Sequence, residues 1–227
     1  MKTIISVIMF LMMTVLSYAN DIYVTQSGNA LDLDITQDGE NNTVGNSTTA
    51  SASAGVTTIL NIDQIGDSNV ITYQINGATY TGVINLVGNS NNVDLNCDST
   101  GGNSSCGTAN AVINFTGSSN DIDLDIGQTS SANTADVDIV GQSGSDSNVV
   151  AATVDGNSAV LTITVNGDTN NYLIDIDGNG DSVGHTLIHS HTGGIADVDI
   201  IQSGTNDNMI TLTTSGDNAD IDISQTD

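Results

Sequence analysis

The chain has 227 residues, of which 27 are Asp or Glu and only one is Lys or Arg, so its formal net charge is −26. Proteins bind nucleic acid and anionic lipid through Lys and Arg, and this composition therefore excludes both as partners. Proline is absent and aromatic residues make up 3%, which predicts a thin core without large rings.

The first 19 residues, "MKTIISVIMFLMMTVLSYA", have the features of a signal peptide. Lys2 precedes an apolar run from Ile4 to Leu16, and the small residues Ser17 and Ala19 fit a cleavage site. The run is short for a membrane span, and no second apolar stretch follows it. We therefore expect a secreted, extracellular protein of residues 20–227, with no membrane insertion after cleavage and no Lys or Arg.

Apolar and polar residues alternate in many short stretches of residues 20–227. Strict alternation is typical of a strand with one buried and one exposed face. Asp disfavours strands, so its regular use at the alternate positions indicates that those positions face water. No stretch after the signal peptide shows a helical period, and we predict an all-β fold. The clearest strands are 31–35, 121–126, 135–139, 196–200 and 219–223.

The turns between these strands repeat the phrase QxGxxN, as in "QIGDSN" at 64–69. Gln64 shares a face with Leu60 and Ile62, and Asn69 shares a face with Ile71. Both amides thus point into the core, where an amide without a hydrogen-bond partner costs about 1–3 kcal/mol. Identical amides stacked about 4.8 Å apart in neighbouring coils supply those partners. Glycine supplies the positive-φ turn between the two amides.

The recurrence of this phrase predicts a two-sided β-solenoid of stacked strand-turn-strand repeats with about 22 residues per coil. A polar residue at a strand end is the simpler interpretation of any single Gln or Asn, but recurrence with the correct parity favours ladders of amides at the corners. The predicted corner residues are Gln26, Gly28, Gln37, Gly39, Asn42, Gln64, Gly66, Asn69, Gly88, Asn91, Gly117, Asn120, Gln142, Gly144, Gly167, Asn170, Gln202 and Gly204.

The repeat resembles the curlin family, whose pattern runs approximately SxxxxxQxGxxNxAxxxQ. "QDGENNTV" at 37–44 and "QIGDSNVI" at 64–71 match its central QxGxxN, and most of residues 21–227 match it loosely. The resemblance implies a subunit of curli-like amyloid fibres that serve cell adhesion and the biofilm matrix. It also implies two partners, namely copies of the chain or another curlin-like subunit, and a secretion apparatus. Several corners lack the Gln, and the alternating Asp residues exceed the family pattern.

The first and last coils repeat the internal pattern. "DIYVTQSG" at 21–28 and "ADIDISQTD" at 219–227 carry no distinct capping sequence. A solenoid of this kind offers unpaired backbone groups at both ends. We therefore expect end-to-end stacking of copies unless the acidic charge prevents it.

Cys97 and Cys106 are the two cysteines of the chain, and they flank "DSTGGNSS". Cysteines of exported proteins usually pair, and closing so short a loop stabilises the folded chain by about 2–3 kcal/mol. We predict a disulfide-closed loop at 97–106 in preference to a metal or redox site.

The outward aspartates raise the question of a cation site. Carboxylates stacked on neighbouring coils suit calcium, which prefers oxygen ligands, whereas a simply solvated acidic face is the alternative. The nonapeptide of calcium-binding β-rolls is missing, so calcium is the one candidate cofactor and no specific site is assigned. The weak metal candidates are Asp123, Asp125, Asp136, Asp138, Asp197 and Asp199.

"HTLIHSH" places His185, His189 and His191 on one face of a strand. Zinc or copper binding is one interpretation, but exposed strand histidines fit better because the spacing matches no known ligand pattern.

No nucleophile motif, phosphate loop or separate acid-base pair occurs, so we predict that the chain is not an enzyme. Two hypotheses remain: a structural subunit that stacks into fibres, and a monomeric acidic β-solenoid that binds divalent cations or a surface. Ice binding is disfavoured because stretches such as "LTIT" and "TLTT" do not recur at one position of the repeat.

Overall fold

The computed structural model describes residues 21–39, 41–45, 51–97, 106, 108–127, 134–156, 158–177, 185–204 and 208–226. The predicted signal peptide at 1–19 and most of the 97–106 loop lie outside these residues. The described residues contain strands and turns and no helix, and therefore no helix that could cross a membrane.

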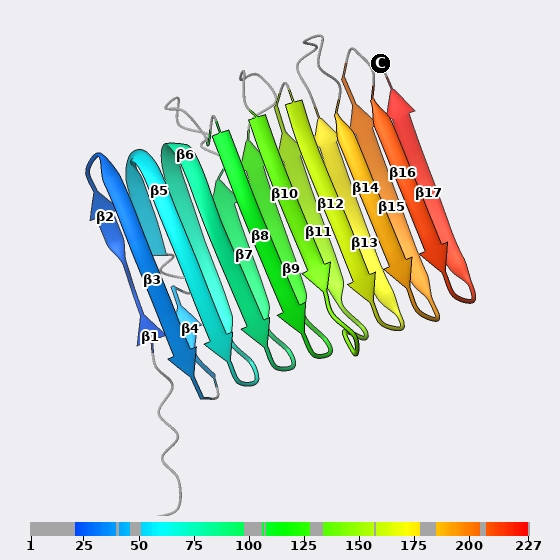
Figure 1. The fold of residues 1–227 in the computed structure, drawn as a ribbon, viewed down its shortest axis with the longest axis horizontal. Helices are drawn as coiled ribbons and strands as arrows, with labels where there is room; N and C mark the ends of the chain where they lie inside the picture. The colour runs from blue at the N-terminus through cyan, green and yellow to red at the C-terminus, as the bar shows by residue number, and fades with distance from the viewer. Residues whose placement is uncertain are drawn as a thin grey trace, which may run out of the picture.

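The strands form two faces of a flattened coil, seen as a front and a back layer in Figure 1. Each coil contributes one strand to each face, and strands within a face pair in parallel and in register. The all-β solenoid predicted from the sequence is confirmed. Two long strands, β5 (Ser51–Ile65) and β6 (Val70–Val87), continue through a turn and contribute one half to each face.

Face 1 begins with β3 and ends with β16. Its strands are β3 (Ala30–Asp38), the second halves of β5 and β6, β8 (Thr108–Thr116), β10 (Thr134–Gly141), β12 (Ser158–Asn166), β14 (Thr186–Thr192) and β16 (Met209–Ser215).

Face 2 begins with β1 and ends with β17. Its strands are β1 (Asp21–Ile22), β2 (Thr25–Ser27), β4 (Thr43–Val44), the first halves of β5 and β6, β7 (Asn92–Cys97), β9 (Asp121–Gly127), β11 (Val149–Asp155), β13 (Asn170–Asp177), β15 (Ala196–Ser203) and β17 (Ala219–Thr226).

The core lies between the faces and is built mainly from columns of aliphatic side chains. The expectation of a core without large rings is wrong, because Tyr73, Tyr80, Phe115 and Tyr172 are fully buried. Alternate residues of each strand point inward, and the register stacks each inward residue on the inward residue of the neighbouring coil. One column on face 1 begins with six isoleucines, before it continues with His189 and Leu212: Ile35, Ile62, Ile84, Ile113, Ile139 and Ile163. All six are at most 5% exposed. Burial of this apolar surface is the main favourable contribution to folding.

The coil is longer than the sequence predicted. Matching residues lie 22 to 29 positions apart, and the coils are about 26 residues apart instead of about 22. Most turns from face 1 to face 2 are short and regular in Figure 1, and the turn between β10 and β11 is two residues longer than the one between β8 and β9. Most of the additional residues lie in the turns from face 2 to face 1, such as the one between Cys97 and Thr108.

Candidate functional site

A buried column of asparagines runs along the edge where face 1 turns into face 2. The Nδ2 of Asn69 donates to the carbonyl of Gly66, three residues earlier, at 2.6 Å. The Oδ1 of Asn91 accepts both the backbone N–H and the Nδ2 of Asn69, each at 3.1 Å. Stacked amides thus satisfy one another inside the core. The column consists of Asn42, Asn69, Asn91, Asn120, Asn148 and Asn170.

Asn148 is the member that the predicted corner residues did not include. Its corner is two residues longer than the preceding one, since Gly141 matches Phe115 and Asn148 matches Asn120, and the Asn stands four residues after Gly144 instead of three. The Nδ2 of Asn148 donates to the Ser145 carbonyl, and its Oδ1 accepts from Asn120 at 3.1 Å. The longer corner therefore preserves the ladder. Beyond Asn170 the column continues with Ala196 and Ala219.

The corner glycines meet two requirements that other residues cannot. Gly39, Gly66, Gly88 and Gly117 have φ between +119° and +146°, a region essentially restricted to glycine. A Cβ at Gly88 would overlap the carbonyl oxygen of Gly66 in the preceding coil, and one at Gly117 would overlap that of Gly88. Tight stacking of successive turns therefore also requires glycine. At Gly167 a Cβ would overlap the Ser145 carbonyl.

The glutamine ladder on face 1 is shorter than the repeat suggested. The Nε2 of Gln64 donates to the Oε1 of Gln37 at 2.7 Å, and both side chains are buried. The column then changes to apolar residues, beginning with Leu86 and Phe115. Gln142 lies beside this column and is exposed, whereas Gly141 takes the inward position because the Phe115 and Val165 side chains fill the space there.

Gln26 and Gln202 lie at the opposite corner, where face 2 turns into face 1. Gln26 in β2 donates from Nε2 to the carbonyl of Ala30 at 3.2 Å. Gln202 is fully buried in β15, and Gln225 of β17 donates to its Oε1 at 3.3 Å. Gly28 and Gly204 belong to the same edge of the molecule. The QxG part of the phrase thus occurs at both corners, and parity alone does not distinguish them.

A further ladder on the outside of the corners was not predicted. The Oδ1 of Asp67 accepts the backbone N–H of Asn89 at 2.7 Å, and the Oδ1 of Asn89 accepts that of Ser118 at 2.7 Å. Asp146 accepts the Asp168 N–H at 2.5 Å in the same way. The signal for this ladder is the Asp or Asn that directly follows the corner glycine in "GDSN", "GNSN" and "GDTN".

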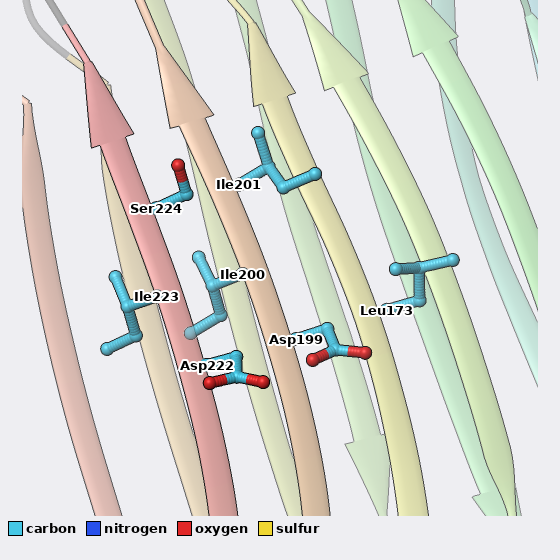
Figure 2. A pocket seen from close by; sticks show the side chains of 7 residues that line it. All are labelled: Leu173, Asp199, Ile200, Ile201, Asp222, Ile223 and Ser224. Atoms are coloured by element: carbon cyan, nitrogen blue, oxygen red, sulfur yellow. The ribbon is translucent and has the colours of Figure 1, made fainter.

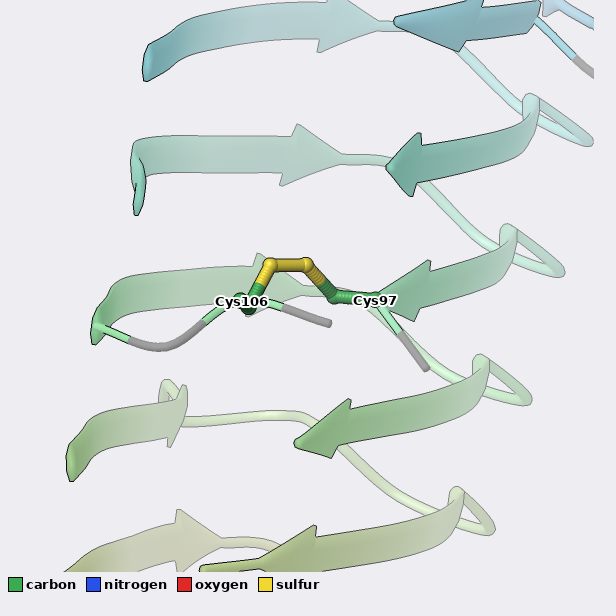
Figure 3. Close-up of a disulfide and its surroundings, with 2 residues drawn as sticks. All are labelled: Cys97 and Cys106. Atoms are coloured by element: carbon green, nitrogen blue, oxygen red, sulfur yellow. A yellow bond between two sulfur atoms is a disulfide. The ribbon is translucent and has the colours of Figure 1, made fainter. Parts of the chain in front are cut away.

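The disulfide connects Cys97, at the end of β7, to Cys106, just before β8 (Figure 3). The two Cα atoms are 5.8 Å apart, and both residues are fully buried. It therefore closes the turn from face 2 to face 1 at this coil, as the sequence predicted.

Most outward aspartates are separated by neutral residues. Asp34 accepts a hydrogen bond from Asn61 at 2.8 Å, and Asp125 accepts one from Asn96 at 3.0 Å. Asp136 is in register with Asn110 and Val160, and Asp138 with Val112 and Thr162. The structure therefore does not stack the carboxylates of Asp136 and Asp138 on other carboxylates.

Aspartates are in register with aspartates at three places on face 2, one of which is Asp155 of β11 with Asp177 of β13. Asp123 is in register with Asp94, and burial together with the charges of Asp94 and Asp121 raises its pKa. At the C-terminal end Asp197 is in register with Asp220, and Asp199 with Asp222. Figure 2 shows Asp199 and Asp222 side by side in a shallow hollow that Leu173 and Ile201 also line. Within the described residues no three metal-ligating side chains converge.

The three histidines are buried, so their interpretation as exposed strand residues is wrong. His185 directly precedes β14, and His189 and His191 lie within it; all three are at most 3% exposed. The Tyr172 hydroxyl lies 2.9 Å from the Nδ1 of His191, and the Tyr172 ring meets that of His189 edge-on, with centroids 4.4 Å apart. Burial, with a smaller contribution from His191, lowers the pKa of His189 to about 4.

The two ends of the coil stack are open within the described residues. The last strands, β16 and β17, pair only with β14 and β15. The inward residues Ile221 and Ile223 of β17 are 37% and 48% exposed, whereas their counterparts one coil earlier, Val198 and Ile200, are at most 1% exposed. At the other end β3 pairs with β5 alone, and its inward Leu31 and Leu33 are half-buried.

The fold and these ends define a class: a two-sided, amide-laddered β-solenoid with open terminal coils. No family model, no curated protein and no solved structure matches the chain. The likeness to the curlin family therefore rests on the corner motif and the repeat.

Proposed function

We propose that the chain is a secreted structural subunit that stacks end to end into extracellular curli-like amyloid fibres for adhesion and the biofilm matrix. The observation that carries this proposal is the open C-terminal coil. It exposes the inward face of a strand whose internal counterparts are fully buried, together with a row of unpaired backbone groups. A second copy is the partner that repeats this pattern, and another curlin-like subunit would fit for the same reason.

The interior favours such growth. Identical side chains already stack on one another in parallel, in-register columns, which is the arrangement that stabilises cross-β fibres. Adding a copy extends those columns and requires no new type of contact. The predicted signal peptide and the acidic, lysine-free surface fit an exported protein that reaches the cell surface through a secretion apparatus.

The test uses purified residues 20–227. Incubation at low salt, and then in about 0.5 M NaCl with millimolar calcium, is followed by Thioflavin fluorescence and electron microscopy. Fibres with a cross-β reflection near 4.8 Å are expected once charge is screened. A folded protein that stays monomeric by light scattering in every condition would contradict the proposal.

A second candidate function is a monomeric acidic solenoid that binds divalent cations. The stacked pairs Asp197–Asp220 and Asp199–Asp222 favour it, because each pair places two carboxylates on adjacent strands. Calorimetry with millimolar calcium measures this directly. An absence of calcium uptake by the soluble monomer would remove this alternative.

A further inference from the structure

The proposed fibre requires a junction between copies, and the structure assigns its geometry. We propose that successive copies stack head to tail with a half-turn about the long axis. In this junction β16 receives β1 and β2 of the next copy, and β17 receives β3. The inference rests on the proposed function and adds the register and orientation of the partner.

The first observation is that the described strands begin and end on the same face. β1 and β2 open face 2, and β17 closes it, whereas face 1 runs only from β3 to β16. Each end of the stack is therefore a step half a coil high. If the next copy kept the same orientation, β1 and β2 would meet β17, and face 1 would lack one strand between β16 and β3. A vacant strand position is about 4.8 Å wide and would leave two edges unpaired.

A half-turn about the long axis exchanges the two faces and closes both steps. The strand directions remain compatible, because faces 1 and 2 run in opposite directions, as the arrowheads of β3 and β17 show in Figure 1. The rotated face 2 strands of the next copy thus run parallel to β16. Its rotated β3 runs parallel to β17. All pairing across the junction is then parallel, as it is within the molecule.

The coil has the internal symmetry that this rotation needs. The inward residues of each face can be numbered along the chain, from Asn170 on face 2 and from His185 on face 1. The ring of Tyr172, at position 2, contacts the ring of His189, at position 3. Gln202, at inward position 4 of β15, donates from Nε2 to the carbonyl of His185, at position 1 of the other face, at 3.3 Å. Inward positions thus face one another in reverse order. A half-turn therefore superimposes each position of one face on the same position of the other.

This symmetry fixes the register of the junction. Counted from the start of each strand, Ile221 stacks on Leu33 of the next copy and Ile223 on Ile35. On the other face Ile210 stacks on Ile22. The exposed or half-buried aliphatic residues of both ends thereby become internal members of the core columns.

The same register joins two short glutamine ladders into one. Gln202 and Gln225 form a pair on face 2 at the C-terminal end, and Gln37 and Gln64 form a pair on face 1 at the N-terminal end. The half-turn places Gln225 on Gln37, which gives a continuous ladder of four amides. Without rotation Gln225 meets Gln26, and the ladder stops there because Ser53 follows in that column.

Two cysteine pairs distinguish the two orientations. Ser224 and Thr36 are exposed, and they stack across the half-turn junction, whereas Ser224 stacks on exposed Thr25 without rotation. Neighbouring strands hold Cα atoms at a separation that a disulfide spans. The double variants S224C/T36C and S224C/T25C, each with the native disulfide intact, are assembled into fibres and oxidised. Covalent multimers are then counted on a denaturing gel, with the single variants as controls.

We expect a long ladder of multimers from S224C/T36C and mainly monomer from S224C/T25C. The reverse pattern, or fibres seen by electron microscopy that cross-link in neither variant, would overturn the half-turn and leave the proposed fibre intact. If the unsubstituted chain forms no fibres in any salt condition, the proposed function fails and this inference fails with it.

Discussion

Gly88 is the residue at which the corner geometry is most demanding. Its φ is +146°, and a Cβ there would overlap the Gly66 carbonyl, whereas Gly39 has a φ of +136° and nothing within 4 Å of an added Cβ. The two sites thus share the backbone strain and differ in packing. We expect Gly39→Ala to lower the free energy of unfolding by about 1–3 kcal/mol, and Gly88→Ala to lower it by clearly more. Urea unfolding followed by circular dichroism measures both, and equal losses would show that coil stacking does not require the glycine.

His189 makes the stability of the chain depend on pH. Burial lowers its pKa to about 4, whereas the unfolded chain titrates near the ordinary histidine value of about 6.5. The unfolded state therefore binds more protons between these values, and the contribution of His189 to stability is lost as the pH falls through that window. The expected loss between pH 7 and pH 4 is about 3 kcal/mol.

The matched variant for this prediction is His189→Leu. His189 is in register with Ile163, so an aliphatic side chain fits that column. Denaturant unfolding at pH 7 and pH 4 should show a smaller acid loss for the variant than for the original chain, while the shared aspartates cancel from the comparison. Parallel pH profiles would contradict a buried, neutral His189.

Among the elements, the disulfide-closed turn between β7 and β8 lends itself to a direct test. Cys97 and Cys106 close a loop of about ten residues, and such closure stabilises a fold by about 2–3 kcal/mol by restricting the unfolded chain. We expect the C97A/C106A double variant to lose about that much stability in urea. Reduction of the unsubstituted chain is the control and should give a similar loss. An unchanged midpoint for both would show that neighbouring coils alone hold this turn.

The strands and the regular corners could be predicted from the sequence because they repeat. Alternation sets which residues face inward, and the recurring Asn after a glycine marks the turn from face 1 to face 2. The turns from face 2 to face 1 have no such repeat, so the length of the coil was underestimated. Gln26 and Gln202 also stand two residues before a glycine but lie at the other edge, because a single strand carries no information about which face it joins.

For a related reason the sequence pattern does not indicate that the three histidines are buried. In "HTLIHSH" the inward positions are His185, Leu187, His189 and His191, so the alternation that marks the other strands is masked by polar residues. Only the register with Ile163 and Val165 of the preceding coil shows that this face of β14 points inward. The ladder on the outside of the corners could not be predicted from the sequence, because Asp and Asn are common in turns that form no ladder.

At the scale of the whole molecule, charge opposes the assembly that the open ends favour. β16 carries no charged side chain, but in the half-turn junction Asp220 and Asp222 of β17 stack on Asp32 and Asp34 of the next copy. Asp220 and Asp222 already stack on two aspartates of β15 within the molecule. Carboxylates about 5 Å apart in water repel by about 1 kcal/mol per pair, and salt screens much of this repulsion. Assembly should therefore be faster and more complete at high salt.

The D220N/D222N variant tests whether this repulsion is local to the junction. Removing two cross-junction pairs, each worth about 1 kcal/mol, should lower the critical concentration for fibre formation at low salt by about tenfold or more. At high salt the variant and the original chain should converge. D136N/D138N removes the same net charge from the middle of β10, where no carboxylate stacks, and should leave the low-salt critical concentration close to that of the original chain. Sedimentation of fibres measures the critical concentration of both variants. Equal effects would mean that the total charge of the chain limits assembly and that repulsion between the junction aspartates does not.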